Sequence, residues 1–188
     1  MKESVTVRQA LDAFYIKHHL PCNGGYDAKS WAFYKIGRFQ LRLPNFKWRQ
    51  RAVPYHDIHH LITGYKCNPA GEMQMAAWEY AAGRFPHVCA TLFCLPLVSM
   101  GAVLFPIRTF KAFVRGSRSR TLYSMEITDA LLDTDLQAIR AEMLPAEKIA
   151  ATPSDYIAYF KLAIQSASII LSPAAAAAAM YYLVKVPS

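Results

Sequence analysis

Charged residues are scarce in this chain of 188 amino acids. Asp, Glu, Lys and Arg make up only 18% of it, whereas 54% of its residues are hydrophobic. That balance is apolar for a water-soluble protein and too polar for a protein with many membrane spans. The length suits one domain of ordinary size with a real core.

Acidic residues are fewest in the first quarter of the chain. Residues 1–51 hold ten Lys or Arg against three Asp or Glu, while the other 137 residues hold eleven against ten. The basic segment 26–51 interleaves its charges with Tyr, Trp and Phe, which is typical of RNA binders and of segments on membrane surfaces. The sequence has no zinc-finger spacing and no aromatic RNP box. We therefore expect a membrane surface with anionic lipids as a partner, and no nucleic acid.

Paired cysteine motifs and a secretory signal are also missing. The four cysteines show no CxxC spacing, which favours reduced, mostly buried thiols in a reducing compartment: Cys22, Cys67, Cys89 and Cys94. Residues 1–20 lack the apolar h-region of a secretory signal.

No segment of the sequence shows sustained alternation of apolar and polar residues between hairpin turns. The sequence therefore predicts an all-α fold. Pro54 suits a first helical turn, Gly64 a helix end, and Asn68 before Pro69 a new start. Helices are expected over 5–19, 28–42, 54–63, 69–83 and 134–144.

Two uncharged runs, residues 88–107 and 162–184, reach the roughly 20 residues of a membrane span. The first contains Pro96, Gly101 and Pro106, and the second contains Gln165 and many alanines. The first run is therefore expected to form buried or interfacial helix. For the second run, a span and a buried helix both stay open.

The segment "HDIHH" carries the chemistry that stands out. On a helix, His56 and His60 share one face, so that both imidazoles can reach one metal ion. Asp57 can add an oxygen ligand or orient an imidazole. The turn-forming residues before Glu72 can fold that acid back onto the histidine face. Imidazoles with carboxylates suit zinc, or iron or manganese.

A helix face that merely carries histidines is the plain alternative. His59 lies three residues after His56 and could compete as a ligand, but a third histidine at this spacing is more typical of a group behind the ligands or of a surface group. His18 and His19 fit a surface position, and His87 fits a helix start.

The spacing H-D-x-x-H, eleven residues, E resembles the signature of the coenzyme Q (ubiquinone) biosynthesis family of the Coq-four type. Its flanks "HDIHHLITGY", "GEMQMAAWEYAAGRFP", "LFPIR" and "DLQAIRAEML" are similar to the family's segments in the same order. The resemblance covers roughly residues 35–143.

This resemblance implies a compact helical domain that sits peripherally on a membrane and holds a divalent metal, usually described as zinc, through His56, Asp57, His60 and Glu72. It implies a polyprenylated benzoate or quinone substrate, with its tail in an apolar groove between helices. The implied activity is removal of the C1 carboxyl group with hydroxylation, as a lyase-type decarboxylase. Arg108 would bind an anionic head group. Implied partners are other quinone-biosynthesis proteins, and homo-oligomers stay open.

The family resemblance places residues 1–143 in one helical domain and leaves 144–188 as an apolar C-terminal helix: an anchor, a lid or a partner surface. It implies the cytoplasmic face of a bacterial inner membrane, or the matrix side of the mitochondrial inner membrane.

Three other functions compete with a metal-dependent enzyme. A non-catalytic prenyl-lipid-binding scaffold could use the same motif structurally. An HD-type phosphohydrolase needs an upstream His and a downstream Asp in place of Glu72. A membrane di-iron oxidase needs more histidine boxes than six histidines supply.

Overall fold

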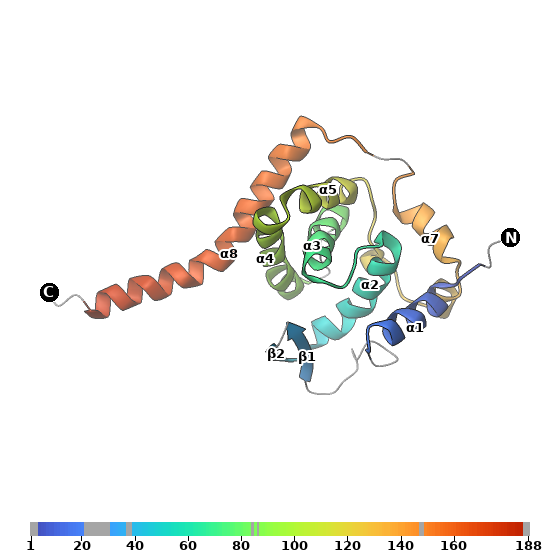
Figure 1. The fold of residues 1–188 in the computed structure, drawn as a ribbon, viewed down its shortest axis with the longest axis horizontal. Coiled ribbons are helices and arrows are strands. Elements are labelled where there is room, and N and C mark those ends of the chain that lie inside the picture. Colours follow the sequence, from blue (N-terminus) through green and yellow to red (C-terminus); the bar gives the residue numbers. More distant parts are fainter. Residues whose placement is uncertain are drawn as a thin grey trace.

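The computed structural model describes residues 4–20, 31–36, 39–83, 85, 87–146 and 149–185, and only the backbone at 31–44, 88 and 174–185. The described chain is helical apart from one hairpin, which confirms the predicted helical class in outline (Figure 1). Its elements are α1 (Val7–Lys17), β1 (Trp31–Ile36), β2 (Phe39–Pro44), α2 (Lys47–Thr63), α3 (Pro69–Gly83), α4 (Val88–Leu104), α5 (Pro106–Gly116), the 3₁₀ turn η1 (Leu122–Ser124), α6 (Asp129–Leu132), α7 (Leu136–Met143) and α8 (Pro153–Lys185).

The hairpin corrects the expectation of a helix over residues 28–42. Strands β1 and β2 pair antiparallel, with Trp31 opposite Pro44 and Ile36 opposite Phe39. The second strand, "FQLRLP", alternates apolar and polar residues, and the first is rich in aromatic residues. Both features favour strands, but the alternation is confined to the six residues of the second strand.

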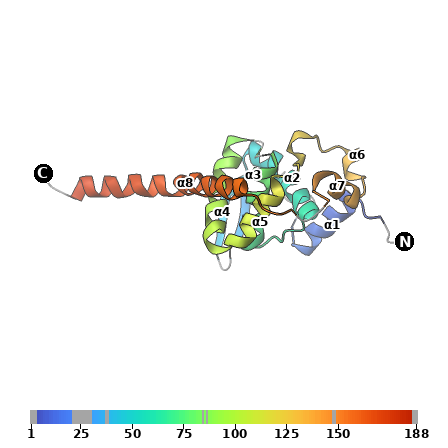
Figure 2. The same ribbon diagram turned by 90° about the horizontal axis from the view of Figure 1, so that it is seen from above.

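Two groups of helices bury separate apolar clusters. Helices α1, α2 and α7 meet around Val7, Ile58 and Ile139. Helix α3 packs against both α4 and α5, and its Trp78 is fully buried (Figures 1 and 2). A side chain at Gly116 of α5 would overlap the Trp78 carbonyl, so glycine permits this close helix approach.

The end of α2 is fixed by two arginines. Gly64 closes the helix in the left-handed conformation, with φ of 76°, as its position predicts. Arg115 donates to the Thr63 carbonyl at 2.8 Å, and Arg140 donates through Nε to the Leu61 carbonyl at 3.0 Å. Cations suit the negative end of the helix dipole. The expected start at Pro54 is wrong, because α2 begins at Lys47 and continues through the proline.

Helix α8 is joined to the residues before it by polar contacts as well as by packing. The Ser166 hydroxyl accepts from the Ser99 amide at 3.1 Å and donates to the Leu95 carbonyl, so it enters the backbone hydrogen bonding of α4. Arg118 pairs with Asp155 at 2.8 Å. The C-terminal half of α8 projects from the body of the molecule (Figures 1 and 2). A domain boundary at residue 143 stays a prediction.

Among the described helices, none combines the length and apolar character needed to cross a membrane.

Candidate metal centre

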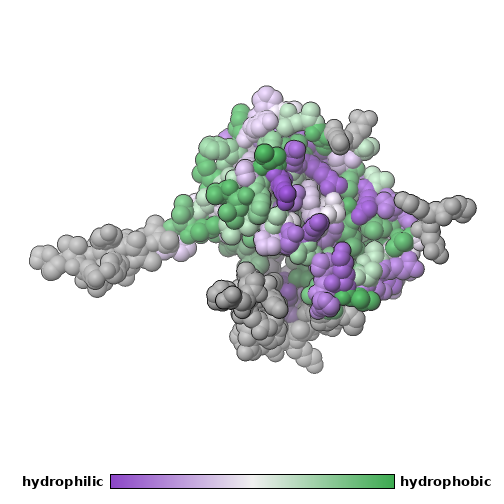
Figure 3. All heavy atoms as spheres, in the orientation of Figure 1, coloured by the Kyte–Doolittle hydropathy of each residue, from purple (hydrophilic) through white to green (hydrophobic). Residues whose placement is uncertain are grey.

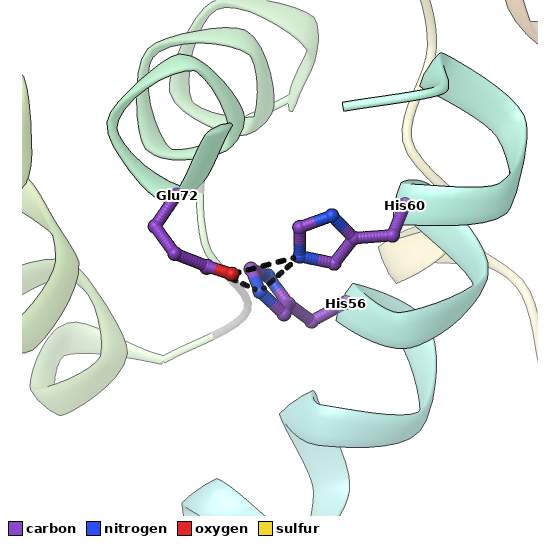
Figure 4. Close-up of side chains that lie close together, drawn as sticks. All are labelled: His56, His60 and Glu72. Atoms are coloured by element: carbon purple, nitrogen blue, oxygen red, sulfur yellow. Dashed lines mark hydrogen bonds and ion pairs between the residues drawn. The ribbon is translucent and has the colours of Figure 1, made fainter. Parts of the chain in front are cut away.

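Three side chains from two helices converge on one point. His56 and His60 project from successive turns of α2, and Glu72 reaches them from the first turn of α3 (Figure 4). The tight turn before α3 sets this approach. The Asn68 side chain accepts from the Gly71 amide at 2.9 Å, and any side chain at Gly71 would overlap the Lys66 carbonyl. The sequence prediction that this turn folds Glu72 onto the histidine face agrees with the structure.

The distances within this cluster suit a tetrahedral metal. The Nε2 atoms of His56 and His60 are 3.1 Å apart, and the Glu72 carboxylate oxygens lie 3.3 Å and 3.4 Å from them. Two donors that each lie 2.0–2.1 Å from a tetrahedral zinc ion are roughly 3.3 Å apart. Two imidazole nitrogens and one carboxylate therefore form a donor set that fits zinc, and these three donors by themselves would leave a fourth position open.

Hydrogen bonds on the far side of each ring hold both Nε2 atoms ready to bind a cation. His60 donates from Nδ1 to the Tyr65 carbonyl at 2.9 Å, and a carbonyl can only accept. His56 Nδ1 lies 3.1 Å and 3.2 Å from the two carboxylate oxygens of Glu79. With Nδ1 protonated, each neutral ring presents its Nε2 lone pair to the cluster.

Glu79 is the functional residue that sequence reasoning missed. It is 1% exposed and also accepts from His59 Nδ1 at 2.7 Å and from the Tyr123 hydroxyl at 2.8 Å. It stands seven residues after Glu72, two turns along the same face of α3. An acid at that spacing in an otherwise apolar helix is the signal that could have identified it.

His59 supports the cluster from behind and does not face it. Its Nδ1 donates to Glu79, and its Nε2 accepts from the Leu122 amide at 3.0 Å. Both ring nitrogens are therefore used, and burial lowers the pKa of His59. A neutral, fully hydrogen-bonded imidazole in this position is a structural group behind the ligands, and the expected alternative of a surface position is wrong, because His59 is fully buried.

The charges of the cluster depend strongly on one another. Burial opposes a charge on His60, but Cys67 and Glu72 raise its pKa to about 9. Burial likewise opposes a charge on Glu72, but hydrogen bonds from His56 and His60 lower its pKa to about 2. For Glu79, burial is again outweighed, here by His56 and His59, and its pKa falls. Without a cation, the carboxylates thus draw protons onto the imidazoles.

Asp57 is not a member of the converging group. It follows His56 on α2 and is buried, and its Oδ2 atom has no hydrogen-bond partner. Burial raises its pKa to about 6. An unpaired carboxylate oxygen beside the cluster suits a positive charge nearby, and its predicted role as a ligand stays a prediction.

The remaining predicted residues lie elsewhere. Arg108 is exposed at the start of α5 and lines a surface groove of about 280 Å³ with Phe105, Pro106 and Ile107. His87 caps α4, as expected, by accepting from the Cys89 amide at 3.1 Å. Cys67, Cys89 and Cys94 are free thiols, and Cys22 lies outside the described residues.

Comparison with family models, curated proteins and solved structures gave no match to this chain. Its relation to the coenzyme Q biosynthesis family therefore stays a prediction carried by the motif and its flanks.

Proposed function

We propose that this chain is a metal-dependent protein of ubiquinone biosynthesis that acts at a membrane on a polyprenylated benzoate. The observation that carries the proposal is the convergence of His56, His60 and Glu72 with distances that suit one divalent ion. The motif resemblance supplies the substrate class and the reaction. Three protein donors with an open fourth position favour catalysis over a purely structural metal.

In the proposed reaction the bond between C1 of the ring and its carboxyl carbon breaks, and carbon dioxide leaves. Written for the substrate carboxylate, the co-reactants are dioxygen, two electrons and three protons. One oxygen atom becomes the new ring hydroxyl, and the other leaves as water. A bound divalent ion would supply a positive charge that polarises the substrate carboxylate or an adjacent oxygen.

The chain's own residues prepare the site for this chemistry. Glu79 and the Tyr65 carbonyl hold the two imidazoles in one tautomer and orientation. The Glu72 side chain is 34% exposed, whereas that of His60 is 2% exposed. The cluster is therefore open on the Glu72 side, and a substrate carboxylate could approach from there.

The protein is loaded separately with zinc, iron or manganese. Each sample is then incubated with a polyprenyl hydroxybenzoate that carries ¹³C in its carboxyl group. Air and a chemical two-electron reductant are present. We expect labelled carbon dioxide and a hydroxylated product from the parent. The His56→Ala protein should form neither product. The His87→Ser protein is the control and should form both, because it replaces an exposed histidine by serine, which is also a good N-cap for α4.

A non-catalytic scaffold that presents a prenyl lipid to other quinone-biosynthesis enzymes is the second candidate. The exposed apolar residues of α4, α5 and α8 favour it. Prenyl lipid that co-purifies with a metal-loaded protein, without release of labelled carbon dioxide with any of the three metals, would support the scaffold and refute the enzyme.

A further inference from the structure

Helix α8 is apolar on two opposite faces. One face packs on α4 and includes the buried residues Leu162 and Ser166. The other carries Ile157, Phe160, Ile164 and Leu171, which are 59%, 67%, 55% and 62% exposed. Their spacing of three, four and seven residues aligns them in one stripe. A helix that is apolar on both sides needs an apolar neighbour on each.

The exposed stripe continues onto α5 across a groove. This surface groove, of about 640 Å³, is lined by residues of both helices, among them Ile107, Phe110, Tyr156, Ile157, Phe160 and Lys161. The rings of Phe110 and Tyr156 stack at 4.4 Å and join the two helices. Ile107 and Val103 beside it are 69% and 79% exposed. Figure 3 shows hydrophobic residues gathered along the described part of α8 and the adjoining body.

Positive charge accompanies this apolar surface, and the acid next to it in the sequence, Asp155 in the first turn of α8, is paired with Arg118. Arg108, Lys111 and Lys161 are exposed and form no ion pair with any residue that the structure describes. Residues 80–125 contain no Asp or Glu, and neither do residues 156–188. Apolar side chains beside unpaired bases are complementary to a surface that offers acyl chains below anionic head groups.

We propose that the α5–α8 face, defined by Ile107, Phe160 and their neighbours in the groove and stripe, docks on a lipid bilayer that contains anionic lipids. A second copy of the chain fits this face less well than a lipid bilayer does. In a two-fold dimer through this face the same bases would meet each other and repel. The inference rests on the membrane location in the proposed function but not on the metal site. The contact with the membrane, which the sequence analysis expected for the basic segment 26–51, is thereby assigned to helices α5 and α8.

Co-sedimentation of the full chain with vesicles tests this surface. Phosphatidylcholine vesicles with and without phosphatidylglycerol are compared, and light scattering gives the oligomeric state of each variant. We expect Ile107→Ser with Phe160→Ser to lower partitioning at least about tenfold, because two apolar groups are lost from the lipid. Ile16→Ser, which removes a 77% exposed residue from α1, is the matched control and should change nothing.

The bases are tested separately. Arg108→Gln, Lys111→Gln and Lys161→Gln together should reduce binding to the anionic vesicles by about fivefold per base and leave binding to neutral vesicles unchanged. Lys17→Gln on α1 is the control for an exposed base. Phe160→Trp should become accessible to quenching by brominated lipids, whereas Ile16→Trp should not.

Two results would overturn the proposal. The first is equal vesicle binding by the parent, the α5–α8 variants and the controls, or no binding by the parent. The second is a change from dimer to monomer on substitution with vesicle binding unaltered, which would assign the face to a second copy. His56→Ala should bind vesicles like the parent, so failure of the metal site and failure of this surface can be told apart.

Discussion

Glu79 accepts a hydrogen bond from Nδ1 of His56 at 3.1 Å, from within the core and behind the cluster that would bind the metal. This contact fixes the tautomer that leaves His56 Nε2 free. Glu79→Gln should therefore lower zinc affinity by about 10- to 100-fold, the usual effect of losing a group that orients a ligand. Competition with a chromophoric chelator measures it.

An exposed acid provides the control for that substitution. Glu126→Gln removes the same charge at the surface and should leave zinc affinity unchanged. If folded Glu79→Gln protein binds zinc as tightly as the Glu126→Gln protein, Glu79 does not orient His56 for a metal.

His59 and His60 are adjacent but should respond in opposite ways. His59→Ala should keep its metal and lose about 2–3 kcal/mol of stability, because the Glu79 carboxylate and the Leu122 amide each lose a buried partner. His60→Ala should lose the metal. Metal analysis after dialysis, together with urea unfolding of the metal-free proteins, separates the two effects. Metal loss from His59→Ala would make it a ligand after all.

Asp57 predicts an unusual pH dependence of the metal-free protein. Its pKa rises from 3.8 to about 6 on folding, so the folded state binds this proton more tightly than the unfolded state. Its contribution to stability is then lost as the pH rises from about 4 to 6, a change of about 3 kcal/mol. Asp57→Asn should stabilise the metal-free protein at neutral pH and have little effect near pH 4.

Urea unfolding in the presence of a chelator, at both pH values, tests the Asp57 prediction. Asp12→Asn, at an exposed position on α1, is the control. Equal destabilisation of Asp57→Asn at both pH values would show that its carboxylate is ionised and well partnered in the fold.

Metal affinity should also depend on pH. Zinc requires neutral imidazoles, and the pKa of His60 is raised to about 9 in the metal-free cluster. A proton must therefore leave when the metal binds. Apparent zinc affinity should rise at least about tenfold per pH unit between pH 6 and 8, and titration calorimetry in buffers of different ionisation enthalpy should detect the released protons. Affinity that is constant across this range would contradict the protonated cluster.

The hydroxyl group of Ser166 makes two hydrogen bonds between α8 and α4. Ser166→Ala removes the group that bonds both the Ser99 amide and the Leu95 carbonyl, and should cost about 1–2 kcal/mol of unfolding free energy. Ser168→Ala, two residues away and exposed, should have little effect. Equal effects in thermal unfolding would show that the Ser166 contacts do not hold the helix.

The sequence predicted most where a local rule determines the structure. Residues four apart on a helix must share a face, and the Asn68–Pro69 turn had to reverse the chain, so His56, His60 and Glu72 could be placed together. Spacing could identify Glu79 as an acid on the face of α3 that carries Glu72, but it could not predict its contacts, because its partners come from α2 and from η1, which only tertiary packing brings to it. The hairpin was missed because only its second strand, six residues long, alternates apolar and polar residues. The start of α2 was missed because Pro54 lies inside a helix that tolerates it.

The most direct test of the account is the metal content and zinc affinity of the purified chain beside His56→Ala and Glu72→Ala. The account predicts one divalent ion per parent chain and loss of the ion from both variants, with their helical content retained. Folded variants that bind the metal as tightly as the parent would contradict it, and the cluster would then be a buried hydrogen-bond network and no metal centre.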